Sequence, residues 1–277
     1  MKRLLLMLAV TLTAAAQGKP YTQMYVFGDS YSDSGAGYVD GNGPTAVVYL
    51  AQRLGIPFTD FGDPKTKAER PVLEGLNFAV SGAQSGSGEG HTYPHGELLG
   101  RGMRNQVDEF AAMVKAGTIT FDRTSTVFFL MGGLNDASLP AGQTRANEEA
   151  LIGTLYALGA RRFKVALLPE QIPQFQKAGT RANAELMELP QEMVAKYPGI
   201  QISHTHWGHF YDAVLTHPAK YGLSNVTDLC AGRALRNEGT TPCATPATYF
   251  FYHSGHPSTA THKAVGELMY EEAVAGR

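Results

Sequence analysis

Short apolar runs alternate with longer stretches of helical pattern along this chain, and this alternation restricts the fold more than any other feature. The apolar runs cover residues 25–27, 127–131 and 163–168, and the helical patterns cover 45–54, 146–158, 180–196 and 259–274. Such alternation favours parallel strands joined by crossover helices. The apolar runs contain few polar residues, as expected where helices cover both faces of a sheet. We therefore predict an α/β domain with a parallel sheet between two layers of helices.

Residues 1–16 have the pattern of a secretory signal peptide. Lys2 and Arg3 precede an apolar run, and small residues follow it up to Ala16. This order of basic, apolar and small residues is typical of a cleaved export signal. Residues 17–277 contain no repeat or linker, and we expect them to form a single domain. No later apolar stretch reaches the roughly 18 residues of a membrane-spanning helix, so we predict a secreted or periplasmic protein without an integral membrane span.

Charge and cysteine content bear on the partner and the compartment. The formal net charge is −2, which gives no support for nucleic acid as a partner. Cys230 and Cys243 are the only cysteines. In an exported protein an isolated pair at this spacing predicts a disulfide across a surface loop. The sequence leaves the oligomeric state open.

Three polar segments each follow a short apolar run. Gly-Asp-Ser ends at Ser30, Asn-Phe-Ala-Val-Ser-Gly ends at Gly82, and Gly-Leu-Asn-Asp contains Asn135. Ligands of open α/β sheets bind at the carboxyl ends of the strands. A glycine there leaves its backbone N–H open to a ligand, since no side chain blocks the approach. The three segments therefore predict a site for acyl transfer, which needs hydrogen-bond donors for a developing oxyanion.

A serine hydroxyl is a weak nucleophile until a base within hydrogen-bond reach accepts its proton. The sequence His-Ser-Gly-His-Pro-Ser begins at His253 and places His256 near the C-terminus. We expect folding to bring His256 to Ser30 as the general base.

The ordered set of motifs resembles the GDSL or SGNH hydrolase family, in its branch of secreted esterases, lipases and acyltransferases. Phe-Gly-Asp-Ser, Asn-Phe-Ala-Val-Ser-Gly, Gly-Leu-Asn-Asp and His-Pro-Ser occur in the family's order over nearly the whole chain after the leader. The resemblance implies a flavodoxin-like fold and a carboxylic ester hydrolase without a cofactor. It also implies Ser30 as nucleophile, His256 as base, and an oxyanion hole formed by the N–H groups of Ser30 and Gly82 with the side-chain amide of Asn135.

One position departs from the family pattern. Three residues before the catalytic histidine, where the resemblance implies an aspartate that orients the imidazole, this chain has His253. Loss of that acid in a serine protease lowers turnover by about 10⁴. Three interpretations follow: a backbone carbonyl or another carboxylate accepts the hydrogen of His256 Nδ1; neutral His253 accepts it; or the protein has lost catalysis and binds acylated sugars or lipids without turnover.

Histidine clusters suggest a further alternative, a metal-dependent hydrolase. His204, His206 and His209 form one cluster, and His262 follows the pair at 253 and 256 to form another. Zinc binds histidine readily, but neither spacing matches the H-E-x-x-H helix of a metalloprotease. We predict no metal and no cofactor.

The substrate and its environment are less defined by the residues. We expect Trp207 to form a hydrophobic wall for the substrate, and the glycine-rich stretch 81–102 to be a surface loop or a lid. The motifs suit a small-molecule, lipid or acylated-sugar ester, with neither the acyl length nor the alcohol fixed. Both hydrolysis and transfer of the acyl group remain open.

Overall fold

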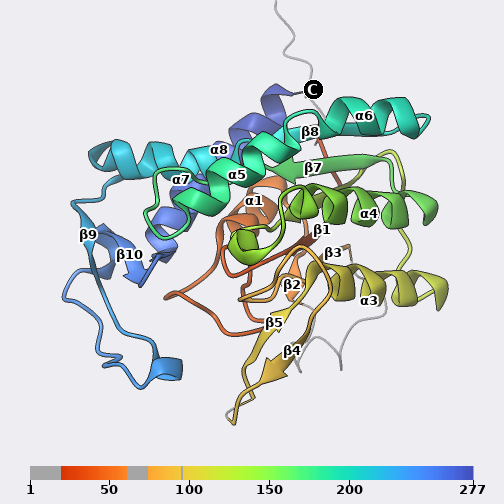
Figure 1. Ribbon diagram of the computed structural model, residues 1–277. Helices are drawn as coiled ribbons and strands as arrows, with labels where there is room; N and C mark the ends of the chain where they lie inside the picture. The colour runs from red at the N-terminus through yellow and green to blue at the C-terminus, as the bar shows by residue number, and fades with distance from the viewer. Residues whose placement is uncertain (1–19, 61–73, 95, 277) are drawn as a thin grey trace, which may run out of the picture.

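The computed structural model describes residues 20–60, 74–94 and 96–276, so the predicted signal peptide lies outside the described residues. A central sheet lies between two layers of helices (Figure 1). Its strands are β1 (Gln23–Gly28), β2 (Thr59–Asp60), β3 (Gly75–Asn77), β6 (Thr126–Met131), β7 (Arg162–Ala166) and β8 (Gln201–Thr205).

The strand order is β2-β3-β1-β6-β7-β8, and every neighbouring pair is parallel. Apart from the two-residue edge strand β2, this is the 2-1-3-4-5 order of flavodoxin-like sheets. The order changes direction at β1, between β3 and β6, and the crevice at such a switch point is where these sheets bind ligands. The predicted flavodoxin-like three-layer fold is confirmed.

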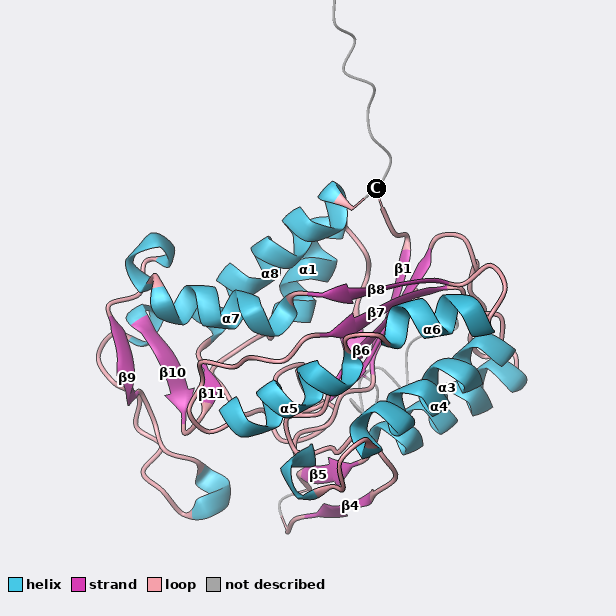
Figure 2. Ribbon diagram, turned by 45° about the horizontal axis from the view of Figure 1, so that its top comes forward, coloured by secondary structure: helices cyan, strands magenta, loops and turns pink. Residues whose placement is uncertain are grey.

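Helices cover both faces of the sheet, as Figure 2 shows. The helices are α1 (Ala46–Leu54), α3 (Met103–Lys115), α4 (Gln143–Ala157), α5 (Gln176–Leu186), α6 (Leu189–Lys196), α7 (Trp207–Thr216) and α8 (Thr259–Ala275). The layer of α1, α7 and α8 packs on one face, and α3, α4 and α6 pack on the other. Strand β1 serves both cores, because Met24 and Val26 face the first layer while Tyr25 and Phe27 face the second.

Two small sheets and four short 3-10 helices complete the described chain. The elements are β4 (Glu89–Thr92), β5 (Leu98–Arg101), β9 (Asn225–Leu229), β10 (Tyr249–His253), β11 (His256–Pro257), η1 (Asp136–Ser138), η2 (Pro218–Tyr221), η3 (Ala234–Arg236) and η4 (Pro246–Thr248). Strands β4 and β5 form an antiparallel hairpin within the stretch predicted as a loop. Strand β10 lies between β9 and β11 and carries the chain toward its last helix.

The helix predicted over residues 180–196 is wrong in one respect, because the chain forms α5 and α6 there instead. Pro190 is the second residue of α6. A proline cannot donate to the preceding turn, and its ring clashes with the carbonyl four residues earlier, so it is tolerated only at the start of a helix. A new helix therefore begins beside it.

The last helix packs against the first one. Tyr49 of α1 and Thr259 of α8 share a 2.8 Å hydrogen bond between their hydroxyl groups, and Arg53 forms a 2.9 Å ion pair with Glu267. Ser258 caps α8 by accepting a hydrogen bond from the backbone N–H of Thr261, as serine at this position commonly does. This packing positions the preceding turn, which carries His256. Within residues 20–60, 74–94 and 96–276, every helix is too short or too polar to cross a membrane.

Candidate active site

Ser30 follows the carboxyl end of β1, in the middle of the sheet. The last residue of the strand is Gly28, and no larger residue fits there because a Cβ would lie 2.5 Å from the backbone oxygen of Met131 in the neighbouring strand. Gln106 of α3 completes the backbone pairing of Gly28, donating to its carbonyl and accepting from its N–H, both at 2.9 Å. Ser30 is therefore held at the end of a rigid strand, with only 6% of its surface exposed.

Two buried carboxylates join the Ser30 turn to the other polar segments. Asp29 accepts hydrogen bonds from the backbone N–H groups of Tyr31 and Leu134, at 3.2 and 3.3 Å. Asp33 accepts from three N–H groups, the closest being that of Ser81 at 2.7 Å. Burial raises the pKa of Asp29 to about 7 and that of Asp33 to about 6, although these N–H groups oppose the shift. The two side chains thus hold three loops at one edge of the sheet.

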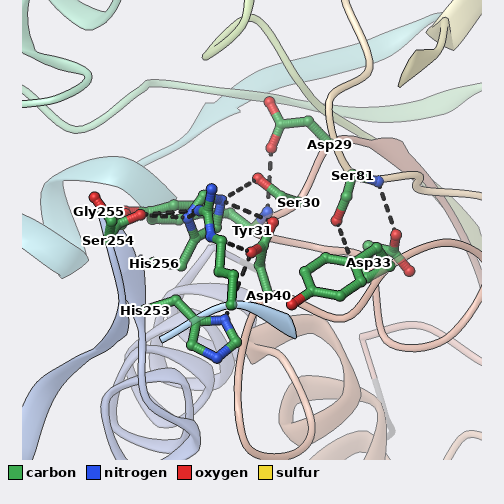
Figure 3. A network of polar contacts seen from close by, with 12 residues as sticks. Asp29, Ser30, Tyr31, Asp33, Asp40, Ser81, His253, Ser254, Gly255 and His256 are labelled. Carbon is green, nitrogen blue, oxygen red and sulfur yellow. Dashed lines mark hydrogen bonds and ion pairs between the residues drawn. The ribbon is translucent and has the colours of Figure 1, made fainter. Parts of the chain in front are cut away.

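His256 reaches Ser30 from the opposite end of the chain. Its Nε2 lies 2.7 Å from Ser30 Oγ, and both side chains are almost completely buried (Figure 3). Gly255, in the turn before His256, has φ +68°, a conformation that favours glycine. The hydroxyl of Tyr31 donates a 2.6 Å hydrogen bond to the carbonyl of Gly255. The structure therefore brings together the predicted nucleophile and base.

The residues predicted to stabilise an oxyanion lie on adjoining loops. Asn135 donates through its side-chain Nδ2 to the carbonyl of Ala83 at 2.9 Å, directly beside Gly82. Gly82 has φ +77°, which again favours glycine. In the part of the chain that the structure describes, the backbone N–H groups of Ser30 and Gly82 donate to no protein acceptor. These two N–H groups and the second hydrogen of the Asn135 amide are available to a ligand.

A match to a protein family adds to this geometry. The model of the family described as GDSL-like Lipase/Acylhydrolase matches residues 24–269. The chain belongs to this family. The match spans the sheet and all four segments that carry Ser30, Gly82, Asn135 and His256. Membership in the GDSL family supports hydrolysis of an ester as the activity, and it favours neither a metal-dependent hydrolase nor a binding protein without turnover.

Plant and bacterial proteins resemble this GDSL chain. A GDSL esterase/lipase of Arabidopsis thaliana is 22% identical, over 98% of this chain and 94% of its own length. The thermolabile hemolysin of Vibrio parahaemolyticus is 25% identical, over 94% of this chain and 66% of its own length. A solved structure of a member of the lipolytic protein G-D-S-L family from Veillonella parvula is 11% identical over 91% of this chain and 96% of its own, with a TM-score of 0.46.

The position where GDSL proteins were expected to have an aspartate does not orient His256 here. His256 Nδ1 faces the backbone carbonyl of Ser254 at 2.9 Å, while Nδ1 of His253 lies 3.6 Å from Oδ1 of Asp40 (Figure 3). Among the described residues, the side chains of His253 and His256 share no hydrogen bond. Nδ1 of His256 therefore faces a backbone carbonyl and not the side chain of His253.

Asp40 and Arg233 are two site residues that the motifs did not reveal. Asp40 Oδ2 lies 3.5 Å from His256 Nε2, and Arg233 contacts Nδ1 of the same ring through Nη2. Asp40 belongs to the loop between β1 and α1, and Arg233 to the loop between β9 and β10. Neither residue lies in a recurring motif, so only the fold could place them together.

The environment of His256 favours its neutral form. Burial is the largest cause and lowers the pKa of the imidazole to about 4, and the positive charge of Arg233 acts in the same direction. Asp40 and the Ser254 carbonyl oppose the shift. Burial would raise the pKa of Asp40, but its contacts with His253, His256 and Arg233 lower it overall, so this carboxylate stays ionised. At neutral pH the ring can accept a proton next to a negative charge.

The histidine clusters do not converge on a metal. Nowhere in residues 20–60, 74–94 and 96–276 do three or more His, Cys, Asp or Glu side chains form a group that could hold an ion. His206 pairs with Glu272 at 2.7 Å, His204 contacts the carbonyl of Leu186 at 3.1 Å, and His262 bonds the hydroxyl of Tyr211 at 2.7 Å. These contacts give the histidines structural partners that are spread over several elements.

Trp207 does not form the predicted wall for a substrate. Its side chain is fully buried at the start of α7, where it packs edge-on against Tyr31 and Tyr211. A large aromatic side chain inside the core gains more from burial than it would at an open site. Trp207 therefore supports Tyr31, the residue that holds the turn before His256.

The predicted disulfide between Cys230 and Cys243 is present. It closes the loop that contains Arg233 and the short helix η3. The backbone N–H of Cys243 also donates a 2.7 Å hydrogen bond to the carbonyl of Cys230, so the two ends of the loop are joined twice. In this GDSL chain the loop joins β9 and β10 of the small sheet, and through Arg233 it reaches the ring of His256.

Proposed function

We propose that the protein is a secreted serine esterase in which Ser30 and His256 act as a catalytic dyad. The observation that carries the proposal is the 2.7 Å contact between Ser30 Oγ and His256 Nε2. Ser30 attacks the ester carbonyl while Nε2 takes the hydroxyl proton. His256 then returns that proton to the departing alcohol, and water or an acceptor alcohol releases the acyl group from Ser30. Hydrolysis and acyl transfer differ only in this last acceptor.

The Ser254 carbonyl replaces the missing aspartate in this proposal. In this proposal Nδ1 carries the ring hydrogen and donates it over 2.9 Å to the Ser254 carbonyl, which can only accept, so the Nε2 lone pair is left for Ser30. A carbonyl gives less electrostatic support to an imidazolium than a carboxylate does. Asp40 supplies the negative charge instead, from 3.5 Å on the Nε2 side. The dyad therefore keeps the tautomer and the charge stabilisation that a triad would provide.

The oxyanion of the tetrahedral intermediate is held by three donors in this proposal. These are the backbone N–H groups of Ser30 and Gly82 and the side-chain amide of Asn135. Support comes from the two free N–H groups and from the bond that fixes the Asn135 amide beside Ala83. Fixed donors stabilise a developing charge without rearranging during the reaction.

Export belongs to the same proposal. The leader pattern at residues 1–16 is the first support, and the Cys230–Cys243 disulfide is the second, because such bonds persist in oxidising compartments. The remaining chain, from residue 17, acts as one domain on a small-molecule, lipid or acylated-sugar ester. Mass spectrometry of exported protein tests this: a chain that starts at or near Gln17 is expected, and a retained Met1 would contradict export by a cleaved leader.

The catalytic proposal is tested with p-nitrophenyl esters of increasing acyl length. Wild type is expected to turn over at least one ester, and Ser30→Ala should lower kcat more than about 10⁴-fold. Ser34→Ala is the matched control, since Ser34 lies in the same loop and bonds Thr45 Oγ1 instead of a histidine. It should retain wild-type kcat. The ester with the highest kcat/KM indicates the acyl length of the substrate.

A covalent probe separates a narrow substrate range from loss of catalysis. A fluorophosphonate should add its mass to wild type and to Ser34→Ala, but not to Ser30→Ala. Folded wild type that neither hydrolyses the esters nor reacts with the probe would refute the serine dyad and favour a binding role.

A further inference from the structure

We propose that Arg233 is a positioning residue for His256, holding the Ser254 carbonyl and the Asp40 carboxylate at the two nitrogen atoms of the ring. This inference rests on the proposed function of the Ser30–His256 dyad. Arg233 Nη2 donates a 2.9 Å hydrogen bond to the Ser254 carbonyl, and Nε forms a 2.8 Å ion pair with Asp40 Oδ1. One guanidinium thus contacts both of the groups that take the place of the expected aspartate.

The planar geometry of arginine suits this double contact. Its five N–H donors lie in a fixed fork, so two acceptors on different loops can be bound at a fixed separation. The Ser254 oxygen has two lone pairs, and it can accept from Arg233 and from His256 Nδ1 together. Nη2 also lies next to Nδ1; since both atoms carry hydrogens in the proposed tautomer, Nη2 donates to the Ser254 carbonyl and only packs against the ring edge. Arg233 is therefore built into the immediate surroundings of the proposed base.

Burial argues that this arginine does more than stabilise the fold. Arg233 and Asp40 are each only 7% exposed at the side chain, the most buried arginine–carboxylate pair among the described residues. Buried ion pairs contribute little net stability, because removing two charges from water offsets their attraction. The two charges compensate each other, and the pair lies along one edge of the His256 ring, with Asp40 near Nε2 and Arg233 near Nδ1. Both charges therefore act on the ring.

The disulfide loop fixes the backbone of Arg233. Cys230 is three residues before Arg233, and the disulfide closes the loop at Cys243. The backbone N–H of Arg233 donates a 2.8 Å hydrogen bond to the Glu238 carboxylate, and Gly232 donates to the carbonyl of Gly239 at the same distance. The long side chain therefore starts from a constrained position, which reduces the entropy lost in holding its two acceptors.

The charged and titratable groups around His256 give the pH dependence a definite sign. Asp40 carries a negative charge and the guanidinium of Arg233 a positive one, while His253 from β10, Tyr31 after β1 and His262 from α8 complete the surroundings of His256. Arg233 lowers the pKa of His256 and Asp40 raises it. Catalysis needs neutral His256, so the acid limb of kcat/KM follows this pKa. Removing Arg233 must move the limb to higher pH, and neutralising Asp40 must move it to lower pH.

The experiment compares Arg233→Met, Arg233→Lys and Asp40→Asn with wild type in ester hydrolysis across pH. We expect Arg233→Met to lower kcat about 10- to 100-fold with little change in KM, as expected for lost hydrogen bonds to a charged group. The acid limb of the kcat/KM profile should move to higher pH in Arg233→Met and to lower pH in Asp40→Asn. Arg233→Lys keeps the positive charge but loses the planar set of N–H donors. The acid limb of its kcat/KM profile should therefore stay near that of wild type, while its kcat should still be reduced.

Arg236→Met is the matched control, because Arg236 is an exposed arginine in the same disulfide-closed loop. It should match wild type in kcat and pH profile. Unchanged or increased kcat in Arg233→Met would overturn the inference, as would an equal loss in Arg236→Met. If Arg233→Met does not fold, an unchanged kcat in Arg233→Lys would still refute the role of Arg233 in positioning the groups around His256. Absence of turnover in wild type refutes the proposed function itself, which separates the two failures.

Discussion

His262 provides a quantitative test of how this core responds to acid. It lies buried in α8, with Nδ1 2.7 Å from the hydroxyl of Tyr211, and its pKa is lowered to about 3, mainly by burial. In the unfolded chain a histidine titrates near its ordinary pKa of about 6.5. Between these two values the unfolded state binds more protons than the folded state. Stability is therefore fully present above about pH 6.5 and decreases as the pH falls toward 3.

The magnitude follows from the two pKa values. Each pH unit in this window changes the free energy of unfolding by about 1.4 kcal/mol per histidine. Between about pH 7.5 and about pH 4.5, His262 alone should account for a loss of about 2.5 kcal/mol. Other groups titrate as well: His256 acts in the same direction, while burial raises the pKa values of Asp29 and Asp33, which act in the opposite one. These other contributions are common to wild type and to a variant that lacks only His262, so they cancel when the two free energies of unfolding are subtracted.

The assay is chemical denaturation of wild type and His262→Asn at both pH values. The smaller asparagine side chain leaves a cavity, which lowers the free energy of unfolding of the variant by the same amount at every pH. Its stability deficit relative to wild type should shrink by about 2.5 kcal/mol from pH 7.5 to pH 4.5, because only wild type has a histidine to titrate there. A deficit that is equal at both pH values would refute the assignment of His262 as a buried neutral residue.

Three further predictions concern the site and the loop beside it. Asn135→Ala should lower kcat by about 10²- to 10³-fold with little effect on KM, measured by ester hydrolysis; a change confined to KM would argue against an oxyanion role. His253→Asp should not raise kcat/KM, because a carbonyl already faces Nδ1 and the new carboxylate would face Asp40; a rise would mean that orientation of the base limits the rate. Reducing the Cys230–Cys243 disulfide should lower the free energy of unfolding by about 3 kcal/mol on the chain-entropy estimate, and an unchanged melting transition would contradict this.

The sequence was sufficient to predict the architecture because the central strands are apolar on both faces. Tyr25 and Phe27 pack on one side of β1 and Met24 and Val26 on the other, so the strand has no polar alternation. A run of this kind favours a strand that is covered on both faces, as in a parallel sheet between two layers of helices. Strand β8 was missed for the opposite reason, since it is the polar edge strand Gln201–Thr205 with only Thr205 buried.

Motifs located the predicted nucleophile and base but not the groups around them. Ser30 and His256 each lie in a short sequence motif, so both could be identified from the sequence, and their contact was predicted from their chemistry. Asp40 and Arg233 lie in loops without a recurring pattern, 193 residues apart by their numbers. Their pairing depends on how the disulfide loop packs against the β1–α1 loop. Trp207 was misplaced because a tryptophan near polar residues suits a ligand wall and a buried core equally well.

The distance along the chain between Ser30 and His256 has a consequence for synthesis. The nucleophile is made within the first 30 residues, whereas the base precedes α8, the last helix, and is held there through contacts such as Arg53–Glu267 between α1 and α8. Domains with many such non-local contacts fold slowly, because the distant segments must meet before the contacts form. A chain still emerging from the ribosome would carry the serine without its base. Ester hydrolysis, on the proposed mechanism, would begin only when the two ends of the chain have met, so a nascent or C-terminally truncated chain would be inactive.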